Sequence, residues 1–118
     1  MNPTAELLLT IRQSVQDEVQ PRLRGFLGGI FRAYLPQSWV FRTEQGVASL
    51  TVDQAGQVSV LDTAASAPDV TVEVGHERLR AALATRRRDG LPPGPLSVTP
   101  HTTKGRTAFD YVRPRLGL

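Results

Sequence analysis

Apolar and polar residues alternate in three successive runs between residues 47 and 74. The runs are residues 48–52, 58–60 and 70–74, in which an apolar side chain recurs at every second position. Successive side chains of an extended strand point to opposite faces of a sheet, so this spacing places the apolar residues on one face. Because such a face must be covered, the segments with helical spacing before and after this region are expected to pack on it.

Alternation and turn residues predict a sheet of five strands. The predicted strands are residues 38–43, 47–53, 58–61, 69–74 and 96–99. Short turns containing Gln and Gly join the first three, which should therefore form an antiparallel meander. A loop rich in Ala, Ser and Thr precedes the fourth strand, and a proline-rich segment precedes the fifth.

Two helices are predicted before the sheet. The first begins with Asn2 as its N-cap and Pro3 in its first turn, and Pro21 is expected to break or kink it. The second, from Leu23 to Tyr34, has apolar residues at helical spacing but also contains three glycines. Each glycine costs about 1 kcal/mol relative to alanine in a helix. Either a backbone packs closely there, or the segment is a movable lid.

Two further helices are predicted after the fourth strand. One begins at Gly75 or His76, turns Leu79 and Leu83 inward, and is expected to end at Gly90. The other is capped by Thr102 or Thr103, presents a small apolar face and ends at Pro114. That face consists of Ala108, Phe109 and Val112.

Composition narrows the class of protein. A chain of 118 residues predicts a single domain over residues 1–118, with a helical segment at 1–36 and the sheet and its covering helices at 37–113. The absence of cysteine excludes disulfides and thiolate chemistry, and a reducing, cytoplasmic location is expected. The sequence shows neither a signal peptide nor an apolar run long enough to span a membrane.

Candidate catalytic chemistry is sparse. The two histidines, His76 and His101, fall at a predicted helix start and in a loop, and they have no spacing typical of a metal site. No nucleophile has an obvious base beside it. Asp53, Asp62 and Asp69 lie at strand ends, where aspartate usually supports backbone hydrogen bonds. We therefore expect a protein that is not an enzyme and that holds no metal or cofactor.

The net charge is +3, and nearly all of the positive charge is arginine, since Lys104 is the only lysine. Arg86, Arg87 and Arg88 are consecutive at the end of a predicted helix. This run is either a solvated helix end that complements the helix dipole or a patch that contacts anionic membranes. Aromatic residues that could stack on bases are missing nearby, which argues against nucleic acid as the partner.

The second part of the chain resembles the sterol carrier protein fold. The resemblance rests on a glycine turn and strand at 56–60, a strand start at 67–72, a helix with Leu79 and Leu83, and a strand at 95–98 that leads into a last helix. It implies a mixed, mainly antiparallel five-stranded sheet with helices over one face. It also implies a tunnel between sheet and helices for sterols, fatty acyl chains or isoprenoids, and no catalysis.

The residues that match inward positions of that family are Val58, Val60, Val70, Val72, Leu79, Leu83, Val98, Phe109 and Val112. Periodicity alone adds Phe26, Ile30, Trp39, Leu50 and Val52 to this predicted cavity. The function expected from these residues is binding or transfer of an apolar small molecule, such as a sterol, a fatty acyl lipid or an isoprenoid or quinone intermediate. The alternative is an assembly module that buries its apolar surface against another subunit, which in a homodimer is a second copy of the chain.

Overall fold

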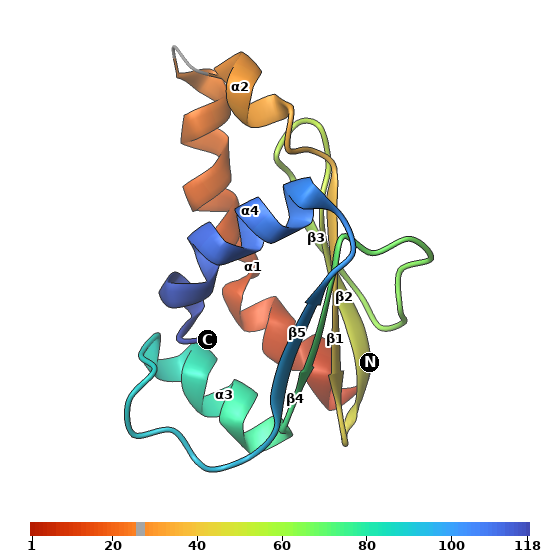
Figure 1. The fold of residues 1–118 in the computed structure, drawn as a ribbon, viewed down its shortest axis with the longest axis vertical. Helices are drawn as coiled ribbons and strands as arrows, with labels where there is room; N and C mark the ends of the chain where they lie inside the picture. The colour runs from red at the N-terminus through yellow and green to blue at the C-terminus, as the bar shows by residue number, and fades with distance from the viewer. Residues whose placement is uncertain (26–27) are drawn as a thin grey trace.

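The structure is a computed structural model that describes residues 1–25 and 28–118 (Figure 1). Its strands are β1 (Gln37–Thr43), β2 (Gly46–Val52), β3 (Val58–Leu61), β4 (Val70–Val74) and β5 (Leu96–Pro100). Its helices are α1 (Pro3–Arg24), α2 (Gly28–Arg32), α3 (His76–Thr85) and α4 (Thr103–Val112), followed by the 3-10 helix η1 (Arg113–Leu116). Helices combined with one five-stranded mixed sheet confirm the predicted α+β class.

The central strand of the sheet is β1. The strand order is β3-β2-β1-β4-β5, and β1 runs antiparallel to β2 but parallel to β4. The predicted meander of the first three strands is therefore confirmed. Trp39 of β1 pairs with Leu50 on one side and Val70 on the other, so the apolar residues of neighbouring strands share one face.

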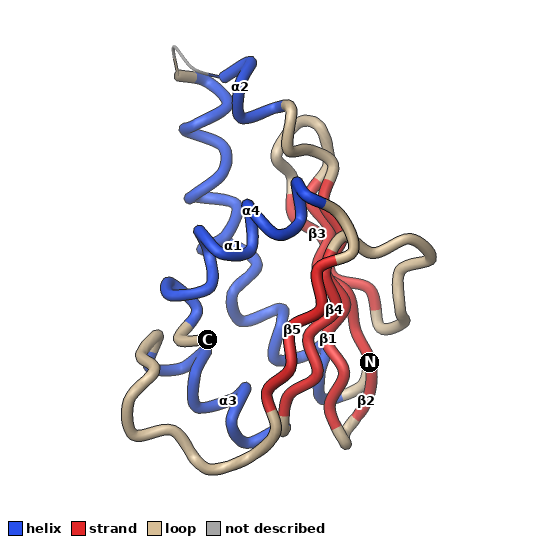
Figure 2. Tube along the Cα trace, viewed as in Figure 1, coloured by secondary structure: helices blue, strands red, loops and turns tan. Residues whose placement is uncertain are grey.

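The long helices lie on one face of the sheet (Figures 1 and 2). Contacts join α1 to β2 and β3, and α4 to β4 and β5, while α3 packs against α1. The space between the helices and the middle of the sheet is filled, because large side chains from all of these layers are at most 1% exposed. Among them are Leu8, Ile11, Phe41, Leu79 and Phe109. Each such side chain contributes roughly 1.5–3 kcal/mol of burial free energy.

The loop between β3 and β4 covers part of the other face. Ser49 is fully buried; its hydroxyl donates to the Thr63 carbonyl at 2.7 Å and accepts from the Ala65 amide at 2.8 Å. Val40, which pairs with Ser49 in the register of β1 and β2, is 1% exposed. The sheet is therefore protected on both sides at this point.

The first helices differ in part from what the sequence predicts. Of the break or kink expected at Pro21, the break does not occur, because α1 continues to Arg24 and its last turn is held by Leu23, which is 5% exposed. The long helix expected from Leu23 to Tyr34 is reduced to α2, and Ile30 on it is 59% exposed. None of the described helices is long and apolar enough to cross a membrane.

Close packing explains Gly28. A Cβ atom at this position would lie 2.2 Å from the carbonyl oxygen of Leu23, which is far too close for any side chain. At Gly29, by contrast, a Cβ would meet no atom of the described chain within 4 Å. The close-packing explanation is thus confirmed at Gly28 and does not apply to Gly29.

Candidate functional site

A cleft of about 610 Å³ opens between α1 and α4. Small-molecule sites typically occupy roughly 300–1,000 Å³. Most of its lining is apolar or aromatic: Val15, Val19, Leu23, Phe31, Tyr34, Leu35, Trp39, Val52, Ala108, Tyr111, Val112 and Leu116. The polar lining consists of Ser14, Asp17, Glu18, Arg22, Gln37, Arg86, Thr107 and Arg115.

The cleft forms because two helices cover different halves of the sheet. The helix α1 lies over β2 and β3, and α4 lies over β4 and β5. Trp39 of β1 and Val52 of β2 form the floor between them and are 4% and 5% exposed. Trp39 also meets Phe109 edge-on, with ring centroids 5.1 Å apart. The floor of the cleft is therefore the surface of the packed core.

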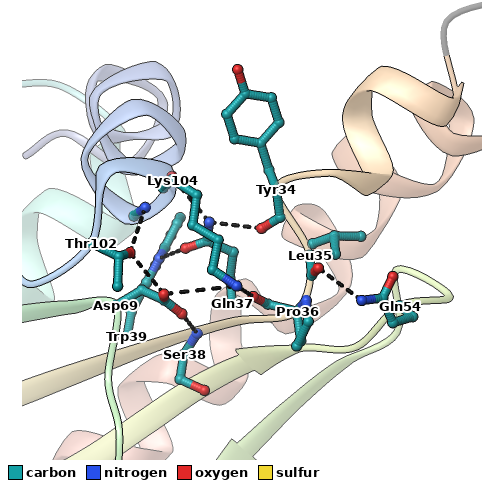
Figure 3. A network of polar contacts seen from close by, with 11 residues as sticks. Tyr34, Leu35, Pro36, Gln37, Ser38, Trp39, Gln54, Asp69, Thr102 and Lys104 are labelled. Atoms are coloured by element: carbon teal, nitrogen blue, oxygen red, sulfur yellow. Dashed lines mark hydrogen bonds and ion pairs between the residues drawn. The ribbon is translucent and has the colours of Figure 1, made fainter.

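A buried glutamine fixes one wall of the cleft (Figure 3). Gln37 is 3% exposed, and its Oε1 accepts a hydrogen bond from Trp39 Nε1 at 2.9 Å. Its Nε2 donates to the carbonyls of Tyr34 at 2.8 Å and Lys104 at 3.1 Å. These bonds satisfy the buried polar groups of both side chains, as buried groups require. They orient the indole ring in the floor and tie the segment before β1 to α4.

Asp69 joins three elements next to this wall, as Figure 3 also shows. Its Oδ2 accepts from the Ser38 amide at 3.0 Å, and its Oδ1 accepts from the Thr102 hydroxyl at 2.8 Å. The Lys104 ammonium lies 3.9 Å from Oδ1. The predicted role of strand-end aspartates in backbone hydrogen bonding is confirmed at Asp69 and at Asp53.

Four side chains form what we call the rim cluster at the mouth of the cleft: Glu18, Arg22, Tyr111 and Arg115. Glu18 Oε2 lies 2.9 Å from Arg22 Nη1 and 4.0 Å from Arg115 Nε. The guanidinium carbons of Arg22 and Arg115 lie 5.2 and 4.1 Å from the centroid of the Tyr111 ring, and both groups donate to the Tyr111 hydroxyl. The cluster connects α1 to α4 and η1 across the mouth.

The structure separates the three predicted patch arginines. The helix α3 ends at Thr85, not at Gly90 as predicted, because Arg86 itself adopts the left-handed conformation and its amide caps the helix. The Arg86 side chain turns back toward α1, donates to Ser14 Oγ at 3.3 Å and lines the cleft. Arg87 and Arg88 are exposed outside the cleft, and Arg87 lies 3.4 Å from an Asp89 oxygen.

The residues of the predicted cavity lie in different places. Trp39, Val52 and Val112 line the cleft. The filled core holds Leu50, Val58, Val70, Val72, Leu79, Leu83 and Phe109. Val60 and Val98 are partly buried at its margin, Ile30 is mostly exposed on α2, and Phe26 lies outside the described residues. The structure thus brings three of these residues together at the cleft.

The rim cluster was missed by sequence reasoning. Arg22 and Tyr111, which are hydrogen-bonded in the fold, are 89 positions apart in the chain. No local pattern connects such residues. The available signal was the apolar face of the last helix, since Ala108 and Val112 mark the side of α4 that borders the cleft.

Other candidate chemistry lies away from the cleft. The Arg80 guanidinium holds the pKa of Glu77 below its usual value, mainly by a hydrogen bond, and Glu77 raises the pKa of Arg80. Both are exposed residues of α3 that do not line the cleft. Within the described residues, no group of three or more His, Asp or Glu side chains could hold a metal ion.

Comparisons of the sequence with protein-family models and with curated proteins find no match. The function of the protein is therefore inferred from the geometry of the cleft. An apolar floor and mainly apolar walls suit a molecule that is apolar along most of its length.

Proposed function

We propose that the cleft between α1 and α4 binds an apolar small molecule, such as a sterol, a fatty acyl lipid or an isoprenoid, and that the protein carries it without catalysis. The observation behind this proposal is the cleft itself, a space of about 610 Å³ with mainly apolar walls. Covering apolar surface is favourable by about 25 cal/mol per Å². The resemblance of the chain to the sterol carrier protein fold agrees with this function.

Occupancy of the cleft would need no rearrangement of the core. The side chains beneath it, such as Leu50 and Phe109, are already packed and at most 1% exposed. A ligand would therefore displace water from the cleft and leave the core side chains in place. Sites that are formed before the ligand arrives avoid much of the ordering cost of binding.

Trp39 allows a direct test, because it is the only tryptophan of the sequence and lies in the floor. A bound fluorescent fatty acid or sterol should accept excitation energy from Trp39 in a saturable manner. Ala108→Phe places a ring inside the cleft and should weaken probe binding by about tenfold, which corresponds to about 1.4 kcal/mol. Ala84→Phe, the same exchange at an exposed position of α3, should leave binding unchanged.

Thermal melts of all three proteins check that each variant is folded. Wild-type affinity in a folded Ala108→Phe protein would place the ligand elsewhere. If the wild-type protein binds no acyl, sterol or isoprenoid probe, the proposal is rejected. Assembly with another subunit then becomes the function to test, by size-exclusion chromatography.

A further inference from the structure

The lining of the cleft holds more positive than negative groups. Three guanidinium groups line it, those of Arg22, Arg86 and Arg115, against the carboxylates of Asp17 and Glu18. Asp17 also accepts a hydrogen bond from the Gln13 amide at 2.8 Å, on the outer side of α1. An apolar space with a positive rim is complementary to a molecule that has an apolar body and one anionic end.

The carboxylate of Glu18 lies between Arg22 and Arg115, so these two arginines can accommodate a carboxylate. One oxygen of its carboxylate serves both Arg22, at 2.9 Å, and Arg115, at 4.0 Å. Glu18 is 51% exposed, and Arg22 and Arg115 are 33% and 45% exposed. Ion pairs this exposed are weak, so a second carboxylate could replace Glu18 at small cost.

Tyr111 holds the arginines independently of Glu18. Both guanidinium groups contact its ring and donate to its hydroxyl, and Arg115 Nη1 also donates to the Tyr111 carbonyl at 2.8 Å. Cation–π and hydrogen-bond contacts of this kind fix a guanidinium group in position. The two arginines therefore stay in place at the mouth when the Glu18 side chain turns away into solvent.

We propose, on the basis of the function proposed above, that the ligand is a long-chain carboxylate. Its alkyl chain lies in the cleft against Val19, Leu35 and Val112, and its carboxylate replaces that of Glu18 between Arg22 and Arg115. While the cleft is empty, Glu18 offsets one of the two positive charges of Arg22 and Arg115. A carboxylate is favoured over a phosphate because a carboxylate already occupies this position.

Displacement of the neutral dye Nile red tests this inference. Dodecanoic acid should bind to the wild-type protein about tenfold more tightly than dodecan-1-ol, which has the same chain without the charge. Arg22→Gln and Arg115→Gln should each weaken binding of the acid by about threefold and leave the alcohol unchanged. Glu18→Gln should strengthen binding of the acid by about threefold, because it removes the competing carboxylate.

Arg12→Gln is the matched control, since Arg12 is an exposed arginine of α1 that does not line the cleft. It should change the affinity of neither ligand.

Equal affinity of acid and alcohol for the wild-type protein overturns the inference but leaves the proposed function standing. Parallel loss of both ligands in Arg22→Gln and Arg115→Gln also overturns it, because the cluster then only braces the helices. Tighter binding of dodecyl phosphate than of dodecanoic acid overturns the assignment of a carboxylate. Absence of binding by the dye and all ligands contradicts the proposed function itself.

Discussion

Asp69 illustrates how one buried carboxylate connects distant segments of a small protein. It is 7% exposed and stands just before β4, yet it accepts hydrogen bonds from the start of β1 and from Thr102, the N-cap of α4. Burial of a charge is unfavourable unless partners compensate. Here the partners are an amide, a hydroxyl and the nearby Lys104 ammonium. The carboxylate thereby positions α4, and with it one wall of the cleft.

We predict that Asp69→Ala lowers the free energy of unfolding by about 1–3 kcal/mol, because the Ser38 amide and the Thr102 hydroxyl lose their acceptor. Asp62→Ala, at an exposed position in the preceding loop, should change it by less than about 0.5 kcal/mol. Urea denaturation measures both values. Equal losses in the two variants would contradict the role assigned to Asp69.

At the scale of residues, the sequence predicted the direction of side chains better than their accessibility. Alternation correctly places Trp39, Leu50 and Val72 on the same face of the sheet. Trp39 reaches the cleft, whereas Leu50 and Val72 lie within the filled core. Which of them a helix covers depends on where α1 and α4 lie, and long-range contacts such as Arg22 to Tyr111 contribute to that placement.

At the scale of elements, a glycine allows α4 to approach the sheet. A Cβ atom at Gly105 would lie 2.5 Å from the Asp69 carbonyl oxygen and 2.8 Å from the Asp69 Cβ. Backbone atoms cannot move aside as the end of a flexible side chain can. The first turn of α4 therefore packs directly on the segment that leads into β4.

We predict that Gly105→Ala destabilises the protein by about 1–3 kcal/mol, since the added methyl group forces α4 away from the sheet. Gly29→Ala in α2 is the control, because its Cβ would meet open space within the described chain. There the better helix propensity of alanine should stabilise the protein by up to about 1 kcal/mol. Thermal melts that show the same sign for both variants would refute the close approach of α4.

The strands could be predicted well from the sequence, and the helices less well. Strand pairing in the meander depends on alternation and short turns, which are local features. The extent of α1 depends instead on packing of Leu23, which outweighs the proline before it. Between Leu23 and Tyr34, apolar spacing indicated one helix, but α2 is limited to Gly28–Arg32 and Gly25 caps α1 in an extended conformation.

At the scale of the whole molecule, the three arginines that follow α3 lie in two different places. All three arginines are exposed, but Arg86 donates to Ser14 and lines the cleft, whereas Arg87 and Arg88 lie outside it. A membrane contact through the arginine run, which is one of the two roles that the sequence leaves open, would therefore involve Arg87 and Arg88 more than Arg86.

We predict that Arg87→Gln and Arg88→Gln each lower the free energy of binding to anionic vesicles by roughly 1 kcal/mol. Arg86→Gln should have a smaller effect, because its guanidinium already donates to Ser14 and Leu83. Vesicle sedimentation at low salt provides the measurement, with neutral vesicles as the control. If all three variants bind anionic vesicles as the wild-type protein does, the arginine run has no part in membrane contact.

The two walls of the cleft come from distant parts of the chain and are therefore synthesised at different times. One wall comes from residues 14–23 and the other from residues 107–116. A nascent chain on the ribosome acquires the first wall early, but it lacks the second until residue 116 has emerged from the exit tunnel. A ligand held between the two walls would therefore bind only after residues 107–116 have emerged and packed beside α1.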